Sequence, residues 1–136
     1  EAEAYDGPSL LICYCHCIAH GYDLIHGLDQ QKAAVQSGYW PLMRYNPDLV
    51  KQGKNPLQLD SRAPTLSLDK YIYNETRYSM LRHGQPEVAK ALYELAEQDV
   101  RRRWKLYEYL ASMPGPGNGG EPAANPVPAG TREEKK

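Results

Sequence analysis

The stretch LLICYCHCIAHGYD, residues 10–23, holds all three cysteines of this 136-residue chain and two of its four histidines. Cys13, Cys15 and Cys17 occupy every second position, which could form a metal site, a disulfide site or one face of a strand. On an extended strand, the Cα atoms of residues i and i+2 lie about 7 Å apart, at the limit for a disulfide bridge. Three thiols so close together cannot form long-range disulfides, so we expect reduced cysteines and a cytoplasmic protein.

A metal site is the first chemical alternative. Cys15, Cys17, His20 and His26 could supply four zinc ligands, because a turn can bring thiolates and imidazoles to tetrahedral distance. A small stand-alone metal- or partner-binding module using these four residues is therefore an alternative function. Two features argue against it: the chain has no second cysteine pair, and a strand before Cys17 would splay the thiols.

The other polar residues show no catalytic pattern. Asp60, Asp69 and Glu75 are too scattered to indicate a carboxylate pair, and no glycine-rich phosphate loop follows a strand. Residues 74–76 (Asn-Glu-Thr) match the N-glycosylation sequon, which we interpret as a chance match inside a predicted helix. The net charge of −1 and the lack of a long apolar run predict no nucleic-acid or membrane partner.

Hydrophobic periodicity and turn residues predict a strand near the start, helices toward the end and a thin core. The expected elements are a buried strand at residues 10–16, a helix at 28–37, a short extended piece at 39–45, a brief strand at 57–59, and helices at 67–82 and from 86 onward. On the last helix, Glu97–Arg101 and Asp99–Arg103 have the i,i+4 spacing of ion pairs. From residue 114 the chain is rich in Pro, Gly and Ala, which predicts a disordered tail. So small a core, and a first residue other than Met, lead us to expect a piece of a longer protein.

The sequence resembles one enzyme family along residues 1–112. The resemblance to pyruvate:ferredoxin (flavodoxin) oxidoreductases is carried by EAEAYDGPSLLICYCHCIAHGYDL, GLDQQKAAVQSGYWPLMRYNPDL, GKNPLQLDSRAPT, YNETRYSML and ELAEQDVRRRWKLYEYLA. It implies an α/β fold that is the terminal part of a thiamine-diphosphate-binding domain. Residues 1–45 would end that domain, 46–113 would form a C-terminal loop and helical segment, and 114–136 would be a tail that the resemblance does not cover.

The resemblance also implies a reaction. Members of the family oxidatively decarboxylate pyruvate to acetyl-CoA and CO2, using thiamine diphosphate and Mg2+, and pass electrons through 4Fe–4S clusters to ferredoxin or flavodoxin. The implied partners are the remainder of the polypeptide, pyruvate, coenzyme A, the electron carrier and a second subunit of a homodimer. The family's magnesium ligands, substrate-binding arginine and other cluster cysteines lie outside this chain, so we expect no catalytic residue in it and no activity from it alone.

One site residue follows from the resemblance. In the family, the segment around this ligand reads Tyr, a small residue, His or Pro, Cys, any two residues, and then His-Gly. Residues 14–21 are similar to this pattern, and only Cys17 falls on the position that ligates the cluster proximal to thiamine. His16 and His20 would then hydrogen-bond near the cluster sulfurs, with ordinary structural histidines as the alternative. Cys13 and Cys15 stand where the family has small residues, so we expect them to be buried and to act as small apolar packing groups.

Overall fold

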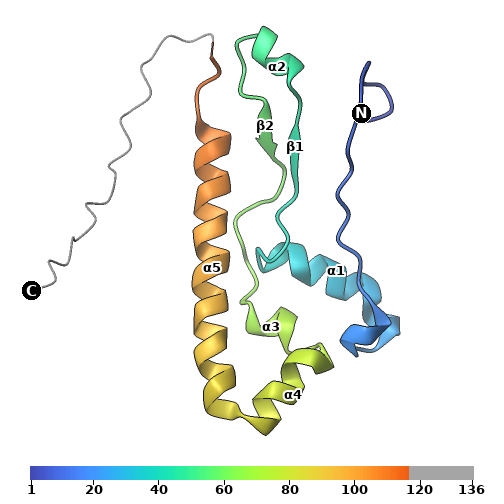
Figure 1. Cartoon of the computed structure of the whole chain (residues 1–136), viewed down its shortest axis with the longest axis vertical. Coiled ribbons are helices and arrows are strands. Elements are labelled where there is room, and N and C mark those ends of the chain that lie inside the picture. The colour runs from blue at the N-terminus through green and yellow to red at the C-terminus, as the bar shows by residue number, and fades with distance from the viewer. Residues whose placement is uncertain (117–136) are drawn as a thin grey trace, which may run out of the picture.

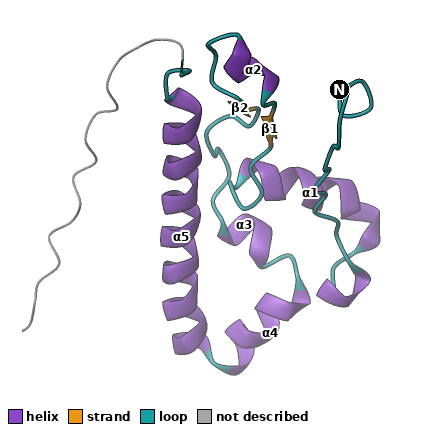
Figure 2. Ribbon diagram, turned by 45° about the horizontal axis from the view of Figure 1, so that its top comes forward, coloured by secondary structure: helices purple, strands orange, loops and turns teal. Residues whose placement is uncertain are grey.

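The computed structural model describes residues 1–116, which are mostly helical and carry one two-stranded antiparallel sheet (Figures 1 and 2). The longer elements are α1 Gly27–Gln36, β1 Met43–Tyr45, α2 Asp48–Lys51, β2 Leu57–Leu59, α3 Asp69–Ile72, α4 Thr76–Gly84 and α5 Pro86–Ser112. Two short 3₁₀ turns, η1 Ile18–His20 and η2 Leu24–His26, precede α1.

Helix α5 forms one long side of the molecule, next to the hairpin of β1 and β2 (Figure 1). It begins at Pro86, because proline suits the first helical position, where no backbone N–H is needed. Ala89, Val100 and Trp104 are its buried residues. Both predicted ion pairs are present, and the prediction of this helix is confirmed.

The hairpin is short and is tied to the end of α5. Met43 pairs with Leu59 and Tyr45 with Leu57. The brief strand predicted at residues 57–59 is confirmed. The Asn55 side-chain amide, between the strands, donates hydrogen bonds to the carbonyls of Leu110, Ala111 and Met113. The Leu110 carbonyl also accepts from the backbone N–H of Met113 at 3.4 Å, and Asn55 adds to this cap of α5 and fixes the hairpin against it.

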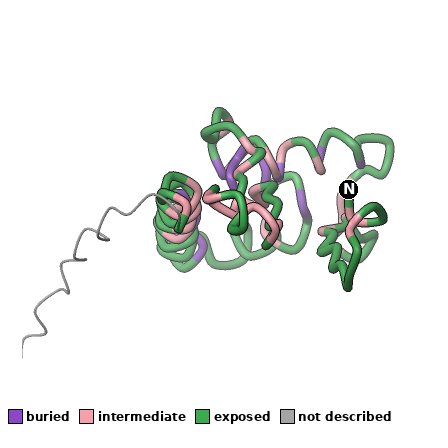
Figure 3. Tube along the Cα trace, turned by 90° about the horizontal axis from the view of Figure 1, so that it is seen from above, coloured by how far each residue is buried: buried purple, intermediate pink, exposed green. Residues whose placement is uncertain are grey.

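The buried core is small and rich in tyrosine. It consists of Ala34, Leu68, Tyr71, Ile72 and Val100, drawn from α1, α3, α5 and the residue before α3. Figure 3 shows short buried stretches scattered along the trace, most of which is exposed. Because the chain contains no phenylalanine, its aromatic packing brings hydroxyl groups that need partners.

The single helix predicted over residues 67–82 is wrong. The structure has α3 and α4 with a break at residues 73–75, and Glu75 is extended (φ −100°, ψ 129°). The side chain of Glu75 is only 1% exposed and accepts hydrogen bonds from Gln30 and Arg77. These contacts fix Glu75 outside the helical conformation, so tertiary contacts outweigh local helix propensity here.

The buried strand predicted over residues 10–16 is also wrong. The segment pairs with no strand among residues 1–116, and Leu10, Leu11 and Ile12 are 84, 69 and 72% exposed. Figure 1 shows it as an extended trace that runs away from α1 toward the N-terminus. The physical reason is that a strand is buried by neighbouring strands, and the described residues supply none at this position.

Three expectations about larger organisation remain as predictions. The described residues do not test the thiamine-diphosphate-binding fold or the boundaries at residues 45 and 113. The tail predicted from residue 114 lies, from residue 117 on, outside the described residues. Within residues 1–116, no helix combines the length and the apolar character needed to cross a bilayer.

Candidate functional site

The candidate site is the cysteine segment, residues 13–17. Cys13, Cys15 and Cys17 are free and exposed, whereas Tyr14 and His16 between them are half-buried. The predicted alternation is therefore present, and the cysteines occupy the solvent side. The expectation that Cys13 and Cys15 are buried packing groups is contradicted, because no strand within residues 1–116 covers their side of the segment.

Tyr14 fixes the segment on its N-terminal side. Its hydroxyl lies 2.9 Å from the hydroxyl of Tyr71, and its carbonyl accepts a hydrogen bond of 3.1 Å from the amide of Gln31 in α1. Its ring stacks on Trp40 at 5.2 Å between centroids. Burial, followed by the hydrogen bond to Tyr14, raises the pKa of Tyr71.

A tight turn fixes the segment on its C-terminal side. In η1, the backbone N–H of His20 donates to the carbonyl of Cys17 at 2.9 Å, and Gly21 follows with φ +69°. The N–H and the hydroxyl of Thr76 both donate to the carbonyl of Gly21, at 2.7 and 2.5 Å. A Cβ atom at Gly21 would lie 2.7 Å from the side chain of Thr76, so both the backbone conformation and this close approach require glycine.

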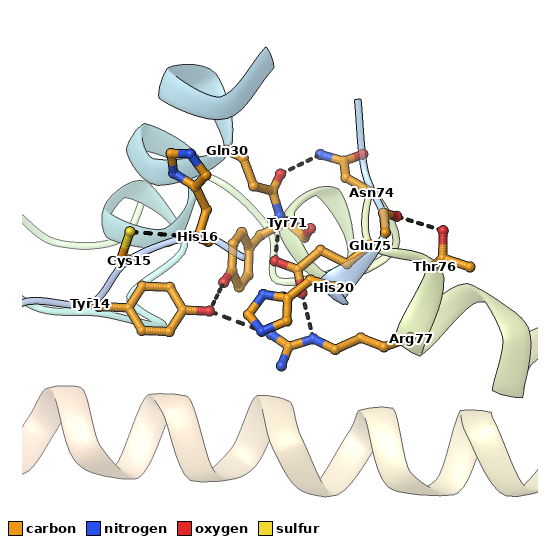
Figure 4. Close-up of polar contacts among 11 residues, drawn as sticks. Tyr14, Cys15, His16, His20, Gln30, Tyr71, Asn74, Glu75, Thr76 and Arg77 are labelled. Carbon is orange, nitrogen blue, oxygen red and sulfur yellow. Dashed lines mark hydrogen bonds and ion pairs between the residues drawn. The ribbon is translucent and has the colours of Figure 1, made fainter. Parts of the chain in front are cut away.

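The buried carboxylate of Glu75 lies between these two points of attachment (Figure 4). Its Oε1 accepts a 3.1 Å hydrogen bond from Gln30, and its Oε2 accepts one of 2.6 Å from Nε of Arg77. The same Oε2 lies 3.8 Å from Nδ1 of His20. Asn74 donates in turn to the side-chain oxygen of Gln30, at 3.1 Å. A buried charge is costly unless it is paired and hydrogen-bonded, and here Arg77 and Gln30 meet that requirement.

Three polar atoms beside the cysteine segment have no hydrogen-bond partner among the described residues: Nδ1 of His16, Nδ1 of His20 and the hydroxyl of Tyr22. The rings of His16 and Tyr22 meet edge to face at 5.7 Å. Burial raises the pKa of Tyr22, and the neighbouring Glu75, Cys15 and Cys17 raise it further.

The structure does not bring the predicted zinc ligands together. Residues 1–116 contain no group of three or more His, Cys, Asp or Glu side chains placed to hold a metal ion. His26 instead lies 3.4 Å from Asp29 on the exposed surface of α1. The alternative of a self-contained site from Cys15, Cys17, His20 and His26 is therefore contradicted, because the turns after Cys17 carry His20 toward Glu75 and His26 toward Asp29.

The residues that sequence reasoning missed are those that hold the segment. Glu75 was considered only as an isolated carboxylate, and Asn74 and Thr76 only as parts of a sequon. All three instead bind polar groups of residues 20–30, about fifty positions earlier in the chain. Their one visible signal was their place in YNETRYSML, a segment that resembles the oxidoreductase family.

Known proteins resemble this chain over most of its length. A pyruvate-flavodoxin oxidoreductase from Nostoc sp. is 58% identical over 112 residues, which cover 82% of the chain and 9% of that enzyme. The chain is homologous to a segment of pyruvate-flavodoxin oxidoreductases. A pyruvate:ferredoxin oxidoreductase from Moorella thermoacetica is 47% identical over 111 residues, covering 82% of the chain and 10% of that enzyme. No family model matches the chain.

The homology extends further than expected in one relative. A Synechocystis protein, also named for pyruvate-flavodoxin oxidoreductase, is 52% identical over 130 residues, covering 94% of the chain and 11% of that protein. The similarity therefore enters the tail, where the sequence resemblance had been expected to stop. The chain spans about a tenth of the length of the curated relatives it matches.

Proposed function

We propose that this chain is the C-terminal part of a pyruvate:ferredoxin/flavodoxin oxidoreductase, in which Cys17 supplies one thiolate to the 4Fe–4S cluster closest to thiamine diphosphate. The observation that carries the proposal is a free, exposed thiol held on both sides by fixed contacts, in a chain 58% identical to such an enzyme. A cysteine thiolate is the usual protein ligand of a 4Fe–4S cluster, which takes four of them.

The donor set of the chain fits one ligand of a cluster and not a complete site. Among residues 1–116 the three cysteines are exposed and do not gather with other donors, so the proposal takes the remaining ligands from the rest of the polypeptide. His16 and Tyr22 each have a buried polar atom without a partner among the described residues, and His16 and His20 are proposed as outer groups near the cluster sulfurs. Nδ1 of His20 lies 3.8 Å from Glu75.

Within the proposed enzyme, the cofactors supply the decarboxylation of pyruvate, the transfer to coenzyme A and the electron transport to ferredoxin or flavodoxin. This chain contributes no catalytic residue. Its part is to hold the Cys17 thiol in place and to pack Leu10, Leu11 and Ile12 against the remainder of the polypeptide. The large exposure of these three side chains supports that packing, because an apolar run of this kind favours burial.

Replacing Cys17 by alanine in the full-length oxidoreductase tests the proposal. We expect Cys17→Ala to lose the iron of one cluster and to slow the reduction of the remaining clusters by pyruvate. Cys13→Ala and Cys15→Ala are matched controls, since they remove the same group from the same segment, and they should keep the full iron content. Full iron and unchanged reduction by pyruvate in Cys17→Ala would overturn the assignment.

A further inference from the structure

A charged pair inside the structure connects both ends of the cysteine segment. Arg77 donates from Nε to Glu75 at 2.6 Å, and its Nη2 lies 3.4 Å from the hydroxyl of Tyr14. Glu75 in turn lies 3.8 Å from His20. Tyr14 stands three positions before Cys17, and His20 stands three positions after it. The two side chains at the start of α4 therefore reach both flanks of Cys17.

The Glu75–Arg77 ion pair is more buried than an ordinary surface ion pair. The Glu75 side chain is 1% exposed, and Arg77 covers it at 34% exposed. Ion pairs elsewhere are more open, such as Asp99 and Arg102 on α5, at 46 and 82% exposed. Placing a carboxylate in the interior carries a desolvation cost that a well-packed apolar residue would avoid, and its benefit is a fixed geometry.

The Cys17 thiol makes no hydrogen bond of its own among the described residues, so its flanks must set its position. On one flank, Tyr14 is held by Tyr71, Gln31 and Arg77. On the other, the carbonyl of Gly21 is held by Thr76, and Nδ1 of His20 lies 3.8 Å from Glu75 without a hydrogen bond. A ligand that is already fixed in this way loses little conformational entropy when it binds a cluster.

From this geometry we infer that Glu75 and Arg77 form a positioning pair that holds the cysteine segment, so that Cys17 is presented to the cluster in one orientation. The inference rests on the proposed role of Cys17. The pair acts through the 3.4 Å contact of Arg77 with Tyr14 and through the 3.8 Å approach of Glu75 to His20. Outer groups that orient metal ligands typically contribute about 10- to 100-fold to metal affinity.

The test uses the full-length oxidoreductase with its clusters. Glu75→Gln keeps the shape of the side chain and removes its charge, and Arg77→Lys keeps the charge and loses the forked reach to Tyr14. Asp99→Asn and Arg102→Lys make the same chemical changes in the exposed pair on α5. Two properties are measured for each protein: the rate at which a chelator removes iron under anaerobic conditions, and the midpoint potential of each cluster by EPR-monitored titration.

We expect Glu75→Gln and Arg77→Lys to release the iron of one cluster about tenfold faster and to shift the midpoint potential of that cluster alone. The affected cluster should be the one that Cys17→Ala lacks, and both α5 variants should behave as the parent. If Glu75→Gln does not accumulate as folded protein, Arg77→Lys decides by the same criteria.

The outcomes separate the two proposals. Iron release and potentials equal to those of the α5 variants, together with a missing cluster in Cys17→Ala, would overturn the positioning pair and leave the ligand assignment intact. Full iron in Cys17→Ala would overturn the assignment of Cys17, whatever the Glu75 and Arg77 variants show. A uniform loss of all clusters in Arg77→Lys would show a general folding role and would also overturn the positioning pair.

Discussion

Gly21 is the position where one added methyl group should loosen the turn after Cys17. At φ +69°, an L-residue other than glycine is less favourable by about 1–2 kcal/mol. The new Cβ would also lie 2.7 Å from the side chain of Thr76, which must move and weaken its two hydrogen bonds to the Gly21 carbonyl. Each such hydrogen bond contributes about 1 kcal/mol.

The net effect of Gly21→Ala follows from these contributions. Alanine restricts the unfolded chain, which offsets about 0.4–1 kcal/mol of the cost. Partial loss of the Thr76 hydrogen bonds, added to the backbone penalty, leaves a local destabilisation of about 2 kcal/mol. Since 1.4 kcal/mol corresponds to a factor of ten, the turn should open about 30 times more often.

Hydrogen–deuterium exchange on the full-length oxidoreductase measures this opening. The amides of His20, Gly21 and Thr76 report it, because each donates a hydrogen bond within or onto the turn. Gly84→Ala is the matched control, since a Cβ at the end of α4 would meet no atom within 4 Å. Exchange of the three amides in Gly21→Ala that equals exchange in Gly84→Ala would refute the argument.

Two further predictions concern the tyrosine pair and the cap of α5. Burial raises the pKa of Tyr71 above that of an unfolded tyrosine, about 10, so its stabilising contribution is complete below that pH and is lost as the pH rises. After correction for intrinsic rates, amide exchange in α3 should rise with alkaline pH in the parent protein, and this rise should be smaller in Tyr71→Phe. An equal rise in both proteins would contradict the prediction. Asn55→Asp keeps the oxygen that accepts from the Leu57 N–H but loses the amide donors to the end of α5. Losing these hydrogen bonds should weaken the last turn of α5 by about 1.4 kcal/mol, so its amide exchange should increase about tenfold. Gln52→Glu in the same loop is the control, and equal exchange in both variants would exclude the cap.

The sequence predicts correctly those helices and strands that are determined by residues close to one another in the chain. Helix α5 begins at Pro86 and carries its ion pairs at the expected spacing, because helix periodicity and first-turn preferences lie within a few residues of each other. The strand Leu57–Leu59 was similarly visible in its alternation. The break at Glu75 was not visible, because its cause is a contact with Gln30, 45 positions away.

The candidate site shows the same division. The alternation of residues 13–17 was correct, whereas the side of the segment that is covered depended on strands that the described residues do not contain. Cys17 was selected by its place in a family pattern, and its role stays a prediction. No spacing rule could have linked Arg77 to Tyr14, since their contact spans 63 positions and depends on how α4 is oriented.

The exposed start of the chain has a consequence for how such a protein must be made and handled. Residues 7–22 include no Lys, Arg, Asp or Glu, so no charge interrupts the run from Leu10 to Cys17. Uncovered, uncharged and extended backbone with apolar side chains pairs readily with copies of itself, and charged gatekeeper residues normally prevent this. Protection must then come from timing: this segment has to be covered soon after synthesis, before aggregation or air oxidation of its three thiols competes with assembly.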